Sequence, residues 1–155
     1  MAVWQYDLLV IPRTRIEQFA CSMLDADVYQ QREWWDDSIT SQQVAARIDA
    51  ILERGRSWLK DLMIWGPEDG NRVDLYVTGN VVSELLVRID LRIFDARFLS
   101  DVISLVRDLD GVFCTEDWTL IDPNLKSLTD SMLRSDAARF VAGPEDFLRK
   151  LREEN

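Results

Sequence analysis

The most regular pattern in the chain lies in residues 81–93, where apolar and polar positions alternate. One side of the alternation holds Leu85, Val87, Ile89, Leu91 and Ile93, and the other holds Glu84, Leu86, Arg88, Asp90 and Arg92. Strict alternation is typical of a strand with one buried face. We therefore expect a long strand here whose second face is either solvated or paired.

Four further strands are predicted by short apolar or alternating runs: residues 3–11, 72–78, 112–115 and 118–121. The first of these is apolar on both faces, which is typical of a central strand, and Pro12 ends it. Gly79 and Asn80 separate the run at 72–78 from the long strand, and this pair predicts a tight hairpin turn.

Helices are predicted where apolar residues recur at helical spacing behind a capping residue. Thr14 with Glu17 and Thr40 with Gln43 have the spacing of capping boxes. Asp95, Asp122 and Ser135 have the side chains of helix caps. The predicted helices are residues 14–25, 40–54, 57–62, 95–109, 123–132, 135–142 and 145–151, with a loop or short irregular helix at 25–39.

This order of elements predicts an α+β fold in one domain covering residues 1–155. Strand, helix, strand, strand, helix, strand is the split β-α-β repeat of a ferredoxin-like plait, an antiparallel sheet with helices mainly on one face. An extra helical C-terminal segment would follow. The first and third strands would be central, so Asp7 and Arg88 are expected to pair across them. A mixed α+β fold with another strand order is the alternative.

The formal net charge of −10 narrows the classes of partner. Nucleic acids and anionic membranes are bound through basic surfaces, so neither is expected. A basic protein partner is favoured because complementary potentials speed encounter, although many ordinary cytosolic proteins are equally acidic. No apolar run is long enough to cross a membrane, and residues 1–7 lack the pattern of a signal peptide. We expect a cytoplasmic protein.

The residue inventory offers little catalytic chemistry. The chain has no histidine, which excludes Ser-His-Asp and Cys-His nucleophilic catalysis. Cys21 and Cys114 have no metal-ligand spacing, and no phosphate-binding loop is present. We therefore expect neither a cofactor nor a metal, and no enzyme. Acidic pairs in loops leave a carboxylate-dependent enzyme as the weaker alternative. These pairs are Asp25/Asp27, Asp36/Asp37, Glu68/Asp69 and Glu116/Asp117.

Candidate protein-binding residues fall into three groups. Trp34 and Trp35 are adjacent, so we expect at least one to be exposed as an aromatic anchor beside acidic residues, or else both to pack a loop onto the body. A turn at residues 65–71 holds the second group, and the charged strand face holds the third. The candidates are Trp34, Trp35, Asp36, Asp37, Trp65, Glu68, Asp69, Arg88, Asp90 and Arg92.

Several stretches also resemble a group of small, acidic, mostly uncharacterised bacterial proteins. These stretches are LDGVFCTED (109–117), LIDP (120–123), SDAARFV (135–141), PEDFL (144–148) and WGPEDGN (65–71). The group is similar in size and acidity to the immunity proteins of bacterial toxin systems. The resemblance implies a non-catalytic protein that neutralises a cognate toxin, and it implies no site residue. A homodimeric, ligand-sensing plait is the alternative.

Overall fold

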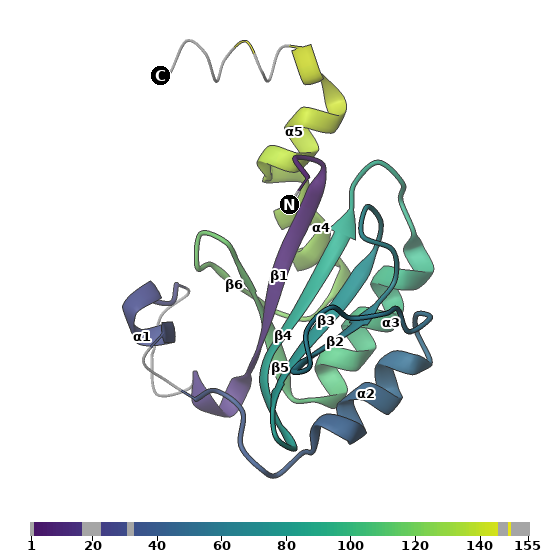
Figure 1. The fold of residues 1–155 in the computed structure, drawn as a ribbon. Helices are drawn as coiled ribbons and strands as arrows, with labels where there is room; N and C mark the ends of the chain where they lie inside the picture. The colour runs from purple at the N-terminus through teal and green to yellow at the C-terminus, as the bar shows by residue number, and fades with distance from the viewer. Residues whose placement is uncertain (1, 17–22, 31–32, 146–148, 150–155) are drawn as a thin grey trace.

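The computed structural model describes residues 2–16, 23–30, 33–145 and 149. Its centre is a six-stranded antiparallel sheet with the order β2-β3-β4-β1-β5-β6 (Figure 1). The strands are β1 (Gln5–Pro12), β2 (Leu62–Trp65), β3 (Arg72–Thr78), β4 (Val81–Asp90), β5 (Gly111–Thr115) and β6 (Leu120–Ile121). The inner four strands have the order of a ferredoxin-like plait, so the predicted α+β fold is confirmed.

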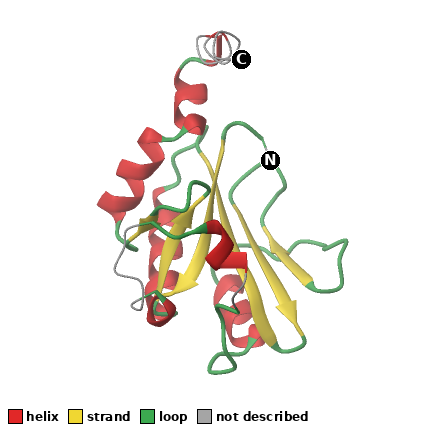
Figure 2. Ribbon diagram, turned by 90° about the vertical axis from the view of Figure 1, so that its left-hand side faces the viewer, coloured by secondary structure: helices red, strands yellow, loops and turns green. Residues whose placement is uncertain are grey.

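Six helical segments accompany the sheet in the described residues. They are η1 (Arg13–Arg15), α1 (Ala26–Gln30), α2 (Ser41–Asp49), α3 (Ala96–Asp108), α4 (Leu125–Arg134) and α5 (Asp136–Ala142). Helices α2 and α3 cover one face of the sheet, whereas α1 lies against the other (Figures 1 and 2). Helices α4 and α5 stand at the end of the sheet where β1 begins. None of the described helices is long and apolar enough to cross a membrane.

The helix-covered face is the main core. Strand β1 pairs with β4 and β5, and the register places Leu8 opposite Val87. Leu8 and Val87 are fully buried, as are Leu75 on β3 and Phe113 on β5. Apolar side chains on both central strands therefore meet those of α2 and α3, and burial of this apolar area stabilises the sheet.

Three local predictions about the helices are confirmed in detail. The Thr40 side chain accepts a hydrogen bond from the Gln43 amide, and the Gln43 side chain accepts one from the Thr40 amide, which completes the predicted capping box. Asp95 accepts a hydrogen bond from the Phe98 amide at the start of α3. Ser135 likewise caps α5 through the Ala138 amide.

Other boundaries were predicted wrongly. Strand β4 ends at Asp90 because its partner β1 begins at Gln5; Ile93 lies beyond the ladder and is exposed. Asn124 caps α4, in place of the predicted Asp122. Met23 bridges Thr119, so the predicted first helix does not extend to Asp25. Residues 17–22 of that helix, and most of the predicted helix at 145–151, lie outside the described residues.

The predicted helix at 57–62 is also wrong. The Ser57 hydroxyl accepts a hydrogen bond from the Leu59 amide and donates one to the Leu59 carbonyl, which holds a turn. Leu62 then begins β2, whose backbone pairs with β3. A short apolar run is compatible with either a helix or a buried strand. Here it forms a strand because it can pair with the free edge of β3.

Candidate binding surface

The second face of the sheet carries the polar residues that the alternation predicted. We call it the polar face; its members include Asp7 on β1, Arg72, Asp74 and Tyr76 on β3, and Glu84, Arg88 and Asp90 on β4. The predicted pair across the central strands is present, because the Arg88 guanidinium donates to both carboxylate oxygens of Asp7 at 2.9 and 3.3 Å. The two charges therefore compensate each other across the central strands β1 and β4.

A second ion pair on this face lies deeper and was not predicted. Arg72 Nε donates to Asp74 Oδ1 at 2.6 Å, and the two side chains are only 5% and 6% exposed. Arg72 and Asp74 are two residues apart on β3 and therefore project on the same face of the sheet, so the alternating pattern of the sequence could have predicted that they are neighbours. Burial of such a pair is tolerated only while each charge keeps its partner.

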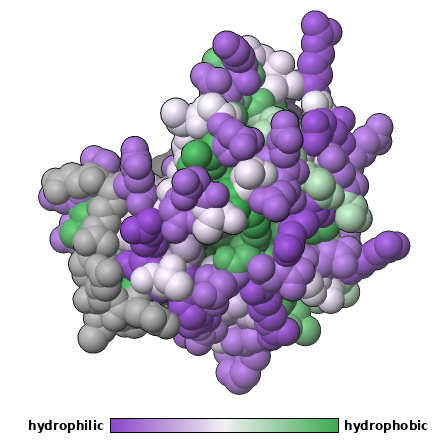
Figure 3. All heavy atoms as spheres, turned by 90° about the horizontal axis from the view of Figure 1, so that it is seen from below, coloured by the Kyte–Doolittle hydropathy of each residue, from purple (hydrophilic) through white to green (hydrophobic). Residues whose placement is uncertain are grey.

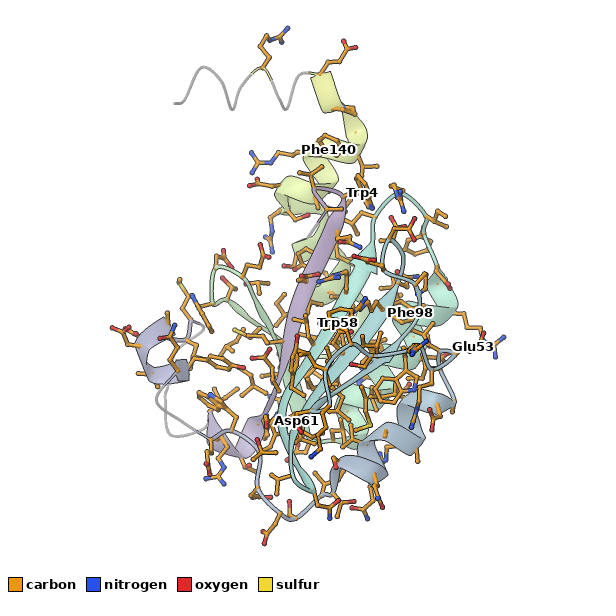
Figure 4. The ribbon with its side chains drawn as sticks, in the orientation of Figure 1. Trp4, Glu53, Trp58, Asp61, Phe98 and Phe140 are labelled. Atoms are coloured by element: carbon orange, nitrogen blue, oxygen red, sulfur yellow. The ribbon has the colours of Figure 1, made fainter. Side chains whose placement is uncertain are left out.

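Trp58 covers this buried pair. The Arg72 guanidinium lies 5.4 Å from the centroid of the Trp58 ring, a cation–π contact. The Trp58 side chain remains 67% exposed, and Leu59 beside it is 52% exposed. Figure 4 shows Trp58 in front of the strands, over the polar face. The prediction that Trp58 continues an apolar helical stripe is therefore wrong, and an exposed aromatic side chain rests on a fixed polar support.

The paired tryptophans Trp34 and Trp35 are buried, at 3% and 5% exposure. The Trp34 indole donates to the Tyr29 carbonyl at 3.0 Å, and its ring stacks on that of Tyr29. Tyr29 in turn contacts Trp118 and donates its hydroxyl to Glu84 on the polar face. The expectation that one of the pair is exposed is wrong, because the loop packs its aromatic side chains onto the sheet.

The acidic neighbours of these tryptophans remain at the surface. Hydrogen bonds from Ser38, first from its side chain and then from its backbone amide, lower the pKa of the Asp36 carboxyl. Asp36 also contacts Arg15 at 3.5 Å, and Asp37 is exposed. Thr40, just beyond them, bridges Val81 at the start of β4. Figure 3, which views the molecule from below in Figure 1, shows mainly hydrophilic residues around a small apolar strip.

The turn at residues 66–71 meets the opposite end of β4. Arg92 donates to the Asp90 carboxylate and to the Asp69 carbonyl, and its guanidinium lies 4.4 Å from the centroid of the Trp4 ring. The Gln5 side chain donates to the Glu68 carbonyl at 2.9 Å. The structure thus brings Glu68, Asp69, Asp90 and Arg92 together. Trp65 is fully buried and donates its indole N–H to Asp49 at 2.7 Å.

The candidate residues therefore do not form one site. The acidic residues at 36–37 lie close to Thr40, which bridges Val81 at the start of β4, whereas the turn at 66–71 lies at the other end of β4, beside Asp90. At the strand rise per residue, these two groups of candidates are about 30 Å apart. The charges of Arg88, Asp90 and Arg92 are already paired within the chain. Hydrogen bonds from Arg92 lower the pKa of the Asp90 carboxyl.

Two cavities flank the sheet near the start of β1. One, of about 760 Å³, lies between β1, the β5–β6 turn and the α4–α5 corner. The other, of about 420 Å³, is a mainly apolar groove between the end of β4, the start of α3, and helices α4 and α5. Its rim holds the exposed side chains of Ile93, Phe94 and Leu133. Neither cavity is lined by the acidic pairs at residues 25/27, 36/37 or 68/69.

Comparisons of the chain with protein-family models, curated proteins and solved structures find no match. Within the described residues, no group of three or more acidic, cysteine or histidine side chains is placed to hold a metal ion. Cys114 is buried, and its burial raises the pKa of the thiol to about 12. All six tryptophans lie in the described residues, and only Trp58 is exposed.

Proposed function

We propose that this protein is a non-catalytic protein-binding module that docks its partner on the Trp58–Leu59 surface. The observation that carries the proposal is the exposed Trp58 ring on the buried Arg72–Asp74 pair. Tryptophan dominates binding hot spots because it offers a large apolar area with few rotatable bonds. A ring already held on one side loses less conformational entropy when a partner covers the other.

The charge of the chain supports a basic partner. The net charge of −10 would speed the approach of a cationic protein. Arg56 and Lys60 flank Trp58 in sequence, so the negative charge that attracts a cationic partner is not supplied by these neighbours of Trp58. The acidic net charge and the resemblance to immunity proteins together favour a cytoplasmic inhibitor of a basic bacterial toxin. An electrostatically steered complex would form fast at low salt and slowly at high salt.

The test is co-purification of the tagged chain with the products of its neighbouring genes, at low and high salt. We expect a stoichiometric basic partner at low salt, and we expect Trp58→Ala to abolish its capture. Leu125→Ala is the matched control, because Leu125 is 54% exposed at the start of α4. Capture that is equal for Trp58→Ala and Leu125→Ala would contradict the assigned surface. A chain that elutes alone, or only with itself, would contradict the proposed function.

A further inference from the structure

Strand β1 is staggered between its two neighbours and has an unpaired edge on its β5 side at residues 5–7. It pairs with β4 from Gln5 to Leu9, but with β5 only from Leu8, which lies opposite Thr115. Thr115 is the last residue of β5. Residues 5–7 of β1 therefore pair with β4 alone, Leu8 and Leu9 pair on both sides, and residues 10–12 pair with β5 alone.

The turn after β5 explains this gap. The Thr115 amide donates to the Thr119 carbonyl at 3.0 Å, and the Thr115 side chain bonds to Asp117. Trp118 has a φ of 64°, a left-handed conformation that lets the chain reverse within four residues. The chain is thus directed into β6 and away from the first three residues of β1.

The backbone register identifies which groups face the gap. The Leu91 amide donates to the Trp4 carbonyl, whereas the Arg13 amide donates to the Asp110 carbonyl. Peptide groups of an antiparallel strand alternate between its two neighbours, so even-numbered residues of β1 face β4 and odd-numbered residues face β5. The Gln5 amide already donates a hydrogen bond to the Ala2 carbonyl at 2.9 Å. Asp7 therefore directs both its N–H and its C=O toward the gap.

The 760 Å³ cavity occupies this side of β1, and its volume is in the range of binding pockets. The β5–β6 turn and the α4–α5 corner form its walls. Its polar lining includes Tyr6, Asp7, Glu116, Ser131, Arg134 and Arg139. Asp7 is neutralised by Arg88. Glu116 is exposed and receives no hydrogen bond from any described residue; partial desolvation of its carboxyl, together with nearby Asp7, raises the pKa of that carboxyl.

We propose that this cavity takes an extended peptide segment of a partner protein, which adds a short strand to β1. The segment would exchange two backbone hydrogen bonds with Asp7, as in other cases where a peptide extends an exposed sheet edge. Its residue opposite Asp7 would project its side chain on the same face as Asp7. A lysine or arginine there would meet Glu116, a carboxylate of the cavity that has neither an ion pair nor a hydrogen bond with any described residue. This site is separate from the Trp58 surface and does not depend on it.

The experiment uses a capped seven-residue peptide of alternating valine and lysine and the full-length protein. Binding is measured by fluorescence anisotropy, and amide hydrogen exchange is followed by NMR. In the free protein the Asp7 amide should exchange faster than the Leu9 amide, which β5 covers. Saturating peptide should slow exchange at Asp7. A peptide N-methylated at its central lysine should bind about tenfold more weakly, since it lacks one backbone donor.

Variants at two exposed glutamates distinguish a direct contact between Glu116 and the peptide from a general effect of net charge on peptide binding. Glu116→Lys should weaken binding about tenfold. Glu53→Lys should change it less than about twofold, because Glu53 is exposed and lies on the right of Figure 4, whereas β6 lies on the left of Figure 1 in the same orientation. Three results would overturn the proposal: equal loss in the two variants, equal binding of the methylated peptide, or an Asp7 amide that is already protected in the free protein. Failure of this test would leave the co-purification result for Trp58 unaffected.

Discussion

The buried pair of Arg72 and Asp74 allows a sharp test of the structure. Replacement of Asp74 by alanine would leave the Arg72 guanidinium buried at 5% exposure without its carboxylate. Loss of one partner from a buried ion pair costs about 3–5 kcal/mol, because the remaining charge is neither hydrated nor neutralised. A domain of this size is stable by about 5–15 kcal/mol, so Asp74→Ala should remove a large share of the free energy of unfolding.

A double replacement distinguishes this mechanism from simple loss of packing. Arg72→Met with Asp74→Leu removes both charges and keeps apolar volume, so it should recover all but about 1–2 kcal/mol of the stability. The surface pair of Arg15 and Asp36 is the control: its side chains are 41% and 51% exposed, so Asp36→Ala should cost at most about 1 kcal/mol. Urea denaturation at pH 7 gives each free energy, with an unchanged m-value as evidence of two-state unfolding.

The assigned role of the pair would be refuted if Asp74→Ala cost less than about 1 kcal/mol, or if the double variant were no more stable than Asp74→Ala. The first result would mean that water reaches Arg72. The second would mean that the pair is needed for its shape and not for the compensation of its charges. Either result would also weaken the claim that Arg72 gives Trp58 a fixed support.

Three further predictions concern binding, cysteine reactivity and pH. Trp58→Ala should weaken partner binding by at least about 2 kcal/mol, or about 30-fold in Kd by titration calorimetry, and change the free energy of unfolding by less than about 1 kcal/mol. In a Cys21→Ser background, the Cys114 thiol, with its pKa raised to about 12, should not react with a thiol reagent at pH 8 until urea unfolds the chain, so labelling of the native protein would contradict its burial. The Asp90 pKa is lowered in the folded state, so its contribution is present above the unfolded pKa of about 3.9 and is lost as pH falls through the folded value; Asp90→Asn should flatten the fall in stability measured between pH 5 and pH 2.

The sheet was predictable because its signals are local and consistent. Alternation located β3 and β4, the pair Gly79–Asn80 located the hairpin between them, and the expected contact between Asp7 and Arg88 followed from the plait order. Capping residues located α3 and α5 for the same reason. These elements are specified by side chains within a few positions of each other.

The candidate site was less predictable because exposure depends on contacts between distant segments. Trp34 is buried against Tyr29, which itself contacts Trp118 and bonds to Glu84 on the polar face, and no local pattern predicts these two longer-range contacts of Tyr29. Trp58 is exposed because the chain turns at Ser57 and begins a strand where a helix was expected. The hydrophobicity of a tryptophan does not indicate whether its side chain is buried in the core or exposed at a binding surface.

The position of β1 has a consequence for how the chain folds during synthesis. The first strand made is the one in the middle of the sheet, and Leu9 pairs with both Leu86 and Cys114. Its neighbours emerge from the ribosome only after most of the chain has been translated, so the contact order of the sheet is high and its folding is correspondingly slow. Until residue 115 is available, β1 exposes an apolar strand edge to other nascent chains. A chain that stops near residue 110 would keep that edge open, which makes aggregation its expected fate.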